Sequence, residues 1–295
     1  MELLDGRKIS NQIKEEITEQ VTKMRERGEK VPHLAAVLVG NDGASLTYVG
    51  SKVKSCEKIG FESTLIQLPS TTSELELLRK IKELNENDDI DGFIVQLPLP
   101  PQIDTQKVLL AVDPDKDVDG FHPMNFGKMA LDMSTFIPAT PFGILELLER
   151  YKVETKGKHT VVIGRSHIVG RPMSILMGRK GWPGNSTVTL THSHTKNITQ
   201  IISQADIVIS ALGVPKFLKA EMVKEGAVII DVGITRVADD TKEKGYYITG
   251  DVDFENVSKK ASFITPVPGG VGPMTIAMLL KNTLLARDRH RAKKQ

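Results

Sequence analysis

A lysine in an unusual place is the first feature that could do chemistry. On a helical wheel of about 100° per residue, the segment 45–60 gathers its apolar side chains on one broad side, and Lys52 falls on that side, one turn after Tyr48. An ammonium group removed from water loses affinity for its proton, so its pKa falls from ~10.4 towards neutrality. Such a lysine can exchange protons at neutral pH. The alternative is a lysine that lies along the helix edge and extends its charge to water.

Three further polar residues stand in suggestive places. Gln96 interrupts the apolar run "FIVQLPLP" near the carboxyl end of a predicted strand, where open α/β sheets bind ligands, and its amide could orient Lys52. Asp117 and Asp119 lie in the loop "DKDVDG". One of these carboxylates could accept two N–H bonds from a guanidine-like heterocycle, or both could serve the turn alone. Cys56 has no histidine nearby in the sequence and is interpreted as a core residue.

A glycine loop, "VVIGRSHIVGRP" (161–172), is the second feature with chemical potential. A strand ends at Gly164 and a helix begins at Gly170, and the N-terminus of a helix suits a phosphate group. The spacing departs from the dinucleotide fingerprint G-x-G-x-x-G, because Arg165 and Ser166 follow the first glycine. The loop therefore predicts a nucleotide site whose middle glycine has been replaced.

The end of the next strand indicates which nucleotide is bound. NAD-binding units carry an Asp or Glu there, which binds the ribose 2′-OH. The strand "TVTLTHSHT" ends instead in His192, Ser193 and His194, with no carboxylate. With Arg165 beside them, these residues favour the 2′-phosphate of NADP. The alternative is that Arg165 makes a local salt bridge on the surface.

Composition bounds the remaining possibilities. The 295 residues predict two domains at ~100–200 residues each, and a net charge of +2 excludes a general polyanion-binding surface. The basic tail 287–294 is interpreted as a solvated terminus. A single cysteine excludes an intramolecular disulfide, and no signal peptide or apolar span is recognisable, so a cytoplasmic protein is expected. The histidines are scattered and no metal site is expected. No P-loop motif for ATP occurs.

Helical and strand patterns alternate along the chain, which predicts a mostly parallel sheet with helices on both faces. In the first half, the expected elements are helices around 9–24 and 45–59, strands at 33–40, 63–68 and 91–100, and a helix that begins with a capping box of Thr71 and Glu74. A boundary is expected just after the loop 113–125. The second half predicts strands at 160–163, 187–191, 206–210, 227–231 and 262–265, and a final helix at 274–287.

These motifs together resemble the bifunctional methylenetetrahydrofolate dehydrogenase/methenyltetrahydrofolate cyclohydrolase family, the FolD proteins. The resemblance spans nearly the whole chain, with the motifs in the family's order: "YVGSK", "KIGF", "DGFIVQLPLP", "PDKDVDGFHPMN", "PATPFGILELL", "VVIGRSHIVGRPM", "HSHT", "GDVDF" and "ITPVPGGVGPMT".

The resemblance implies an α/β fold of two domains that face each other across a cleft. Residues 1–125, completed by 273–295, would form the folate-binding domain, and 140–270 a Rossmann-type NAD(P)-binding domain. It implies oxidation of 5,10-methylenetetrahydrofolate by NADP+ and hydrolysis of the product to 10-formyltetrahydrofolate. It also implies a cytoplasmic homodimer in one-carbon metabolism and purine biosynthesis.

The resemblance also implies roles for individual residues. Tyr48 would stack on the aminobenzoate ring, Lys52 would be the essential group of the cyclohydrolase with Gln96 orienting it, and Asp119 would hold the pterin. The folate side would be lined by Pro268, Gly269 and Val271. The cofactor positions would be Thr140, Gly164, Arg165, Ser166, His192, Ser193 and Ile234, of which Thr140 and Ile234 would lie near the nicotinamide.

Two departures from the family pattern bear on the cofactor. The connection "GRKGWPGNSTV" is longer than usual, which makes the reach of the 192–194 loop uncertain, and His194 stands where Lys or Arg is common. Two rival functions remain. A binding module without chemistry is disfavoured by the intact set Tyr48, Lys52, Gln96 and Asp119, whereas a dehydrogenase without cyclohydrolase activity stays open.

Overall fold

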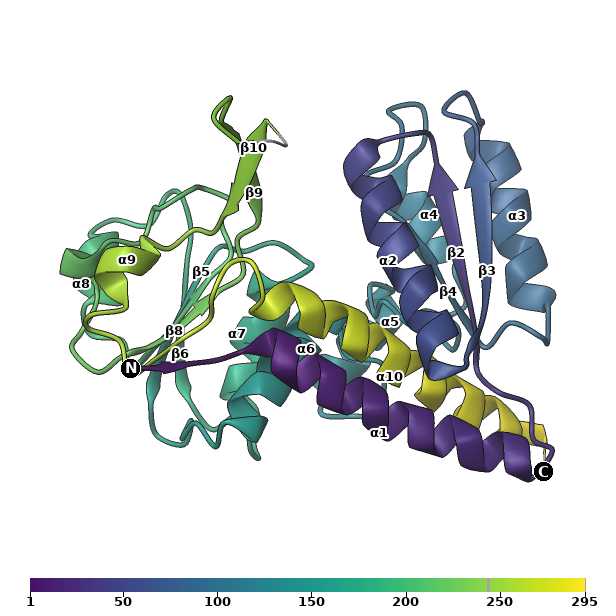
Figure 1. Ribbon diagram of the computed structural model, residues 1–295, viewed down its shortest axis with the longest axis horizontal. Coiled ribbons are helices and arrows are strands. Elements are labelled where there is room, and N and C mark those ends of the chain that lie inside the picture. The colour runs from purple at the N-terminus through teal and green to yellow at the C-terminus, as the bar shows by residue number, and fades with distance from the viewer. Residues whose placement is uncertain (243–244, 295) are drawn as a thin grey trace. The chain divides into compact units, whose positions relative to one another are not determined.

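The computed structural model describes residues 1–242 and 245–294 and divides the chain into two compact units (Figure 1). One comprises Met1–Asn11 and Thr140–Thr275, and the other Gln12–Ala139 and Ile276–Gln295. The first eleven residues fall in the compact unit that carries the larger sheet. The reason is strand β1 (Glu2–Leu3), which pairs in parallel with β11 (Phe263–Ile264).

The unit around Gln12–Ala139 contains a three-stranded parallel sheet of order β3-β2-β4. Its strands are β2 (His33–Val39), β3 (Glu62–Leu68) and β4 (Gly92–Val95), and its own helices are α2 (Gly43–Ile59), α3 (Glu74–Glu86), α4 (Thr105–Ala111) and α5 (Pro123–Ala130). Helices α2 and α3 cover opposite faces of the sheet (Figure 1). Alternate residues of β2 pack against α3 and α4 in one apolar core. The central strand β2 is buried along nearly its whole length, whereas the edge strand β3 is partly exposed.

The N-terminus of α3 lies two residues later than expected. Ser73, not Thr71, caps the helix: its hydroxyl accepts a bond from the backbone N–H of Glu76, and the Glu76 carboxylate accepts one from the backbone N–H of Ser73. Glu74 instead pairs with Lys107 of α4. The prediction of a capping box was therefore correct, but its position was wrong by two residues, because Thr71 with Glu74 and Ser73 with Glu76 both fit the pattern.

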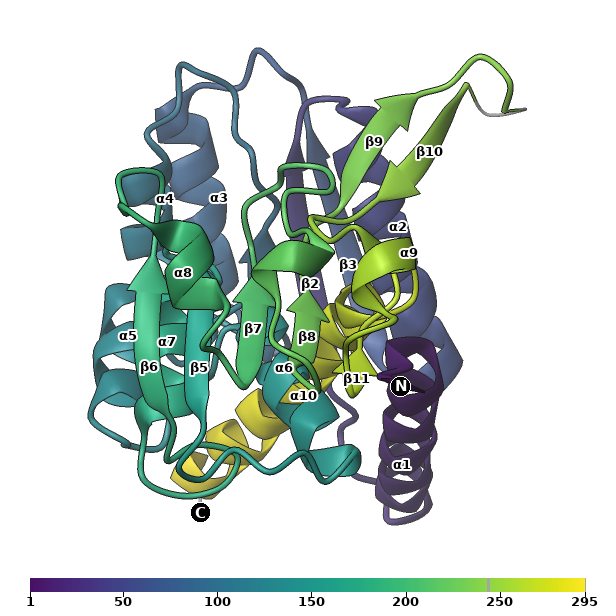
Figure 2. The ribbon, with the colours of Figure 1, turned by 90° about the vertical axis from the view of Figure 1, so that its left-hand side faces the viewer.

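The other unit contains a six-stranded, fully parallel sheet of order β1-β11-β8-β7-β5-β6, seen in Figure 2. Its remaining strands are β5 (His159–Ile163), β6 (Thr187–Thr191), β7 (Ile207–Ser210) and β8 (Val228–Asp231). Because β5 lies between β6 and β7, the strand order reverses there. Open sheets bind ligands outside the carboxyl ends of strands at such a switch point.

The helices of this unit connect its strands. They are α6 (Ala139–Arg150), α7 (Gly170–Gly178), α8 (Ile198–Ile202), α9 (Phe254–Val257) and a short 3-10 turn at Ala220–Met222. A two-stranded antiparallel hairpin of β9 (Thr235–Ala238) and β10 (Tyr246–Thr249) was not predicted. Its strands are short and mostly half-exposed, so they carry little of the hydrophobic pattern by which strands are recognised.

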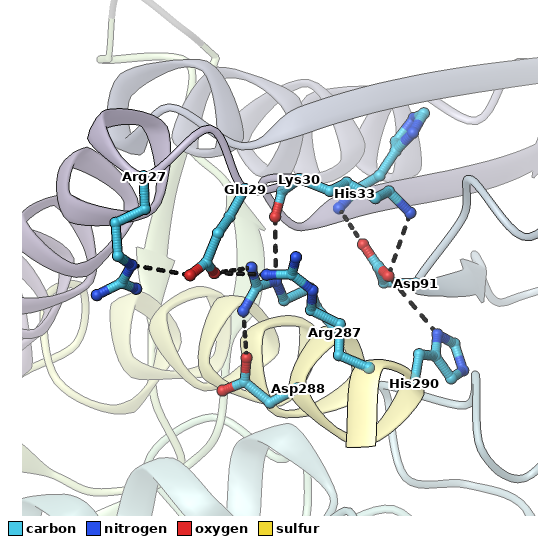
Figure 3. Close-up of polar contacts among 9 residues, drawn as sticks. Arg27, Glu29, Lys30, His33, Asp91, Arg287, Asp288 and His290 are labelled. Carbon is cyan, nitrogen blue, oxygen red and sulfur yellow. Dashed lines mark hydrogen bonds and ion pairs between the residues drawn. The ribbon is translucent and has the colours of Figure 1, made fainter. Parts of the chain in front are cut away.

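The basic tail is not a solvated terminus. The last helix, α10, runs from Val271 to Lys294, well beyond its expected end. Arg287 is only 5% exposed, and its guanidinium donates to the Lys30 carbonyl at 3.0 Å and the Glu29 carboxylate at 2.6 Å. Figure 3 shows these contacts, with Arg27 on the other side of Glu29. The tail predicted as solvated thus fastens α10 to the turn after α1 (Gly6–Glu26).

A second carboxylate, that of Asp91, also contacts α10. Asp91, at the start of β4, accepts a hydrogen bond from the backbone N–H of His33 at 2.8 Å and an ion pair from Lys30 at 3.4 Å. The His290 ring of α10 lies 3.6 Å from the same carboxylate (Figure 3). The sheet edge and the final helix are therefore joined by polar contacts.

We expect the Glu29 contacts to stabilise the fold in a pH-dependent way. The bond from Arg287, followed by the effects of Arg27 and Arg291, lowers the pKa of Glu29 to about 2. A carboxyl whose pKa is lower in the folded state contributes stability above its ordinary pKa, and that contribution is lost as the pH falls towards 2. Glu29→Gln should therefore melt at a lower temperature than the wild type at pH 7, with the difference shrinking below pH ~4.5.

Thermal melts of both proteins between pH 2 and 7 measure this difference. Glu19→Gln, at an exposed position on the preceding helix α1, is the matched control and should melt like the wild type throughout. A deficit in Glu29→Gln that stays constant over the whole pH range would contradict the assignment.

Candidate active site

The lysine predicted to be tuned by burial is buried. Lys52 is only 3% exposed on α2, so the alternative of a lysine that extends its charge to water is wrong. Its Nζ donates a hydrogen bond to Oε1 of Gln96 at 3.3 Å and lies 4.6 Å from the centroid of the Tyr48 ring. Tyr48, Lys52 and Gln96 therefore form one cluster within the smaller-sheet unit.

The end of β4 fixes the orientation of Gln96. The backbone N–H of Gln96 donates to the Val37 carbonyl at 2.8 Å, continuing the ladder one residue past the strand. The side-chain Nε2 donates to the Leu97 carbonyl at 2.7 Å. Because the amide nitrogen is thus engaged, the amide oxygen is the atom that faces Lys52.

Asp119 is the charged group that acts on Lys52. Burial lowers the pKa of Lys52, and the negative charge of Asp119 opposes the shift. In the same way burial raises the pKa of Asp119, with Lys52 opposing. Both shifts favour the neutral forms, so the amine gives up its proton more readily than an exposed lysine does. Such a group suits general acid–base work.

The two aspartates of the loop have different surroundings. Asp117 accepts hydrogen bonds from the backbone N–H groups of Gly120 at 3.2 Å and His122 at 2.7 Å, and from Nδ2 of Asn125 at 2.9 Å. It therefore holds the turn, which leaves Asp119 as the carboxylate next to the lysine. Cys56 is a core residue, as expected, and burial raises its pKa to about 12, so it is no nucleophile at neutral pH.

Close packing explains the two glycines of the nucleotide loop. Gly164 follows β5 with a φ of 110°, and a Cβ there would lie 2.3 Å from the Ala211 carbonyl oxygen beyond β7. A Cβ on Gly170 would lie 2.0 Å from the Gly164 carbonyl oxygen. Both positions therefore require glycine. Arg165 and Ser166 are exposed, so the missing middle glycine is explained by a loop that turns outward.

Ser166 also has a local role. Its hydroxyl oxygen accepts hydrogen bonds from the backbone N–H groups of Val169 at 3.1 Å and Gly170 at 3.4 Å. The hydroxyl proton stays available to an acceptor outside the loop. The N-terminus of α7 is thereby ordered by the same side chain that was expected to meet the cofactor.

Basic side chains converge at the carboxyl ends of β5 and β6. Arg165 makes no hydrogen bond or ion pair with any other residue that the structure describes, so the local salt bridge considered above is wrong. The pKa of His192 is lowered, first by burial and then by the positive charges of Arg165 and His194. His192 Nδ1 accepts a bond from the backbone N–H of His194 at 3.2 Å, and Ser193 between them is exposed.

The long connection before β6 does not displace these groups. The register of β5 and β6 pairs His159 with Thr187 and Ile163 with Thr191, so the insertion enters at the amino end of β6. It is fastened there by Thr155, whose hydroxyl exchanges hydrogen bonds with Gly184. The residues after Thr191 are therefore positioned by strand pairing, independently of the connection's length.

A pocket of about 170 Å³ lies beside the glycine-rich segment of the same unit. It brings together Ile234 with Pro268, Gly269 and Val271, all of which had been expected to line a ligand site. Thr140 is not among its lining residues, and its hydroxyl lies 3.0 Å from that of Thr275.

The pocket also contains residues that the sequence did not single out, among them a cationic one. Arg7, at the start of α1, lines the pocket, and its backbone N–H donates to the Gly269 carbonyl at 2.9 Å. Gly6, which precedes Arg7, is the sequence feature that could have indicated this contact. A Cβ on Gly6 would lie 1.8 Å from the Gly270 carbonyl oxygen, so a glycine at a helix start marked a close approach of two backbones.

Within the ranges 1–242 and 245–294, no group of three or more His, Cys, Asp or Glu residues is placed to hold a metal ion. No helix in the part of the chain that the structure describes has the length and hydropathy to span a membrane.

We expect Gly164→Ala to destabilise the larger-sheet unit. The added methyl group would be forced against the Ala211 carbonyl in a left-handed backbone conformation, and such strain costs about 1–3 kcal/mol. Chemical denaturation measures the loss. Gly157→Ala is the matched control, because Gly157 also has a positive φ, of 71°, but no atom lies within 4 Å of its Cβ position. Equal losses in the two variants would show that contact with Ala211 is unimportant.

Comparison with known proteins matches both halves of the chain. Residues 4–119 match the family model described as tetrahydrofolate dehydrogenase/cyclohydrolase, catalytic domain, and residues 138–291 match the NAD(P)-binding domain of the same family. A protein of Flavobacterium psychrophilum named bifunctional protein FolD is 82% identical over 291 residues, covering 99% of each chain. A protein of the same name from Bacteroides fragilis is 59% identical and covers 97% of this chain and 98% of the relative.

Solved structures agree with these sequence matches. The bifunctional enzyme FolD of Campylobacter jejuni superimposes with a TM-score of 0.92 at 46% identity, covering 98% of this chain and 99% of the other. The dehydrogenase-cyclohydrolase of Trypanosoma brucei, solved with NADP and an inhibitor, gives a TM-score of 0.91 at 40% identity, covering 97% of this chain and 96% of the other. The two-domain α/β prediction, with a Rossmann-type second domain, is confirmed.

Proposed function

This chain belongs to the tetrahydrofolate dehydrogenase/cyclohydrolase family, and we propose that it carries out both reactions of that name. It oxidises 5,10-methylenetetrahydrofolate to 5,10-methenyltetrahydrofolate with NADP+ and hydrolyses the product to 10-formyltetrahydrofolate. NADP+, when bound, supplies the acceptor for the hydride. The relatives named bifunctional support both activities over the dehydrogenase alone.

The buried Lys52 is the observation that carries the hydrolytic half. As water adds to the methenyl cation it must lose a proton, and the ring nitrogen that leaves must gain one. An amine whose pKa is lowered by burial can serve both steps near neutral pH. We assign Lys52 as the proton-transfer group and Gln96 as the residue that orients it, because the 3.3 Å bond to a fixed amide oxygen restricts where Nζ lies.

The neighbouring residues suit the flat, polar rings of a folate. We assign Tyr48 to stacking on the aminobenzoate ring, since its ring already lies against Lys52. We assign Asp119 to the pterin, whose guanidine-like edge offers two parallel N–H donors to a carboxylate. Pro268, Gly269 and Val271, which share a pocket with Ile234, are assigned to the folate side on the family resemblance.

The larger-sheet unit suits NADP in particular. A carboxylate at the end of the second strand would disfavour a 2′-phosphate, and none stands there, whereas Arg165 is unpaired among the described residues and lies close enough to lower the pKa of His192. We assign Arg165, Ser166, His192 and Ser193 to the adenosine end with its 2′-phosphate. Gly164 allows the cofactor's close approach, and Thr140 and Ile234 are assigned to the nicotinamide on the family resemblance.

The family resemblance also supports a wider setting. We propose a homodimer that works in the cytoplasm and supplies 10-formyltetrahydrofolate to purine biosynthesis. The single cysteine is compatible with a reducing compartment. Sedimentation of the purified protein tests the dimer.

Arg165→Ala should change the preference between cofactors. If Arg165 binds the 2′-phosphate, its loss should weaken NADP+ by about 1.5–3 kcal/mol, the scale of a hydrogen bond to a charged group. NAD+, which lacks that phosphate, should bind almost as before. Michaelis constants for both cofactors measure the change.

Arg179→Ala provides the matched control, because Arg179 follows the other end of α7. It should leave both constants unchanged. Equal loss of NADP+ and NAD+ in Arg165→Ala would show that this arginine does not recognise the 2′-phosphate.

Lys52→Met should separate the two reactions. Methionine is similar in length but cannot exchange protons, so hydrolysis should fall by at least the ~10²–10⁴-fold typical of general acid–base catalysis. Hydride transfer needs alignment but no proton, so the dehydrogenase should lose less. Methenyltetrahydrofolate should then accumulate, which its absorbance reports.

The melting temperature of Lys52→Met shows whether a loss of activity comes from misfolding. Because Lys52 is desolvated, an apolar replacement should melt at or above the wild-type temperature. Lys54→Met, at an exposed position two residues away on the same helix, should leave both activities intact. Near wild-type hydrolysis by folded Lys52→Met would refute the assignment of Lys52.

A further inference from the structure

Two buried carboxylates lie at the carboxyl end of the larger sheet without a cationic partner. Asp231, the last residue of β8, is 3% exposed, and Asp251, in the turn after β10, is 0% exposed. Neither forms an ion pair with another residue in the ranges 1–242 and 245–294. Burying an unpaired carboxylate costs several kcal/mol, so the hydrogen bonds that these groups accept must offset a substantial penalty.

Asp251 holds the loop that follows β7. Its Oδ2 accepts bonds from the backbone N–H of Leu212 at 2.7 Å and from the hydroxyl of Ser210 at 3.3 Å. Its Oδ1 accepts one from the backbone N–H of Val214 at 2.9 Å. One carboxylate therefore spans the whole turn from the end of β7 to Val214.

Asp231 holds Asp251 in turn. Its Oδ1 accepts bonds from the backbone N–H groups of Asp251 at 2.9 Å and Gly233 at 3.0 Å, and its Oδ2 accepts one from that of Val252 at 2.9 Å. Two glycines pack closely against these carboxylates: a Cβ on Gly233 would lie 2.3 Å from Oδ1 of Asp251, and one on Gly250 would lie 1.9 Å from Oδ2 of Asp231. The loops after β7 and β8 are thus linked through carboxylates.

The linked loops border the ligand end of the sheet. Asp231, Gly233 and Ile234 line the 170 Å³ pocket, whereas Asp251 does not. Ala211, at the start of the loop that Asp251 holds, is also the residue against which Gly164 packs. Any shift of the Asp251 carboxylate would therefore be passed to both the pocket wall and the nucleotide loop.

We propose that Asp251 is a positioning residue for NADP+, which holds the loops after β7 and β8 in the shape that receives the nicotinamide end of the cofactor. The inference rests on the proposed function. Asp251 acts through Leu212, Val214 and Gly233 and does not itself touch the cofactor. Its effect is preorganisation, which saves the loops the cost of being ordered when the ligand binds.

Asp251→Asn tests the proposal with little change in volume. An amide presents only one acceptor oxygen, so one of the loop N–H groups would face an NH2 donor instead. We expect the Kd of NADP+ from calorimetry to rise by about tenfold to 100-fold, the loss of a hydrogen bond to a charged group. Dehydrogenase kcat should fall, with a larger primary deuterium isotope effect on oxidation of the dideuterated methylene substrate. Hydrolysis of methenyltetrahydrofolate without NADP+ should stay within about twofold of wild type, because Lys52 belongs to the other unit.

Asp253→Asn is the matched control, two residues away, where the carboxylate lies 4.0 Å from the Lys219 ammonium and accepts a bond from Asn256 at 3.0 Å. It should match the wild type in every measurement. Wild-type NADP+ affinity in Asp251→Asn would overturn the proposal. Equal loss of both activities with an unchanged isotope effect would also overturn it, because that result reports only a smaller fraction of folded protein.

If Asp251→Asn does not fold, Ser210→Ala decides, because it removes one donor to Asp251 and leaves the carboxylate in place. A smaller rise in the Kd of NADP+ with normal hydrolysis supports the inference, and an unchanged Kd overturns it. A wild-type protein that binds NADP+ but does not oxidise methylenetetrahydrofolate would instead remove the proposed function alone.

Discussion

The buried ammonium of Lys52 determines which groups must surround it. A charge that is only 3% exposed must find compensation nearby or give up its proton. The compensation comes from three separate segments: the ring of Tyr48 one turn earlier, the amide of Gln96 at the end of β4, and the carboxylate of Asp119 in the following loop. The positions of Gln96 and Asp119 in turn depend on hydrogen bonds made by residues that take no part in the reaction.

That local structure shows how site and scaffold are joined. Asp117 accepts three hydrogen bonds that shape the loop, and the loop then presents Asp119 to the lysine. Gln96 is held by its bond to the Leu97 carbonyl. Side chains that touch no substrate thus set the proton affinity of the one that we assign to the chemistry.

The lysine could be recognised from sequence because helical periodicity is a local property. Lys52 lay on the apolar side of a pattern that repeats every 3.6 residues, and burial followed. The parallel strands were recognisable for the same reason, and their alternation with helices indicated the α/β class. The convergence of Arg165 and His192 followed from the rule that adjacent parallel strands end at the same edge.

What could not be predicted depended on distant partners. The strand β1 has two residues and no pattern, and only its pairing with β11 makes it a strand. Arg287 was interpreted as solvated because its acceptors, Glu29 and the Lys30 carbonyl, are more than 250 positions away. The Asp231–Asp251 pair was missed since each carboxylate taken alone is ordinary turn chemistry. Sequence patterns describe near neighbours, and these features are made by remote ones.

The pairing of β1 with β11 has a consequence for the order of events during synthesis. Glu2 and Leu3 leave the ribosome long before their partners Phe263 and Ile264 are made. The strands β2, β3 and β4 all lie before residue 96, so their sheet can form early. The other sheet cannot be completed until β11 is made. Strand β1 waits for its partner while all the residues between them are added, and the edge of β8 stays unpaired from its own synthesis until Phe263 and Ile264 follow. A nascent chain of this protein therefore exposes the unpaired backbone edge of β8, which can pair with another chain, until elongation has supplied β11.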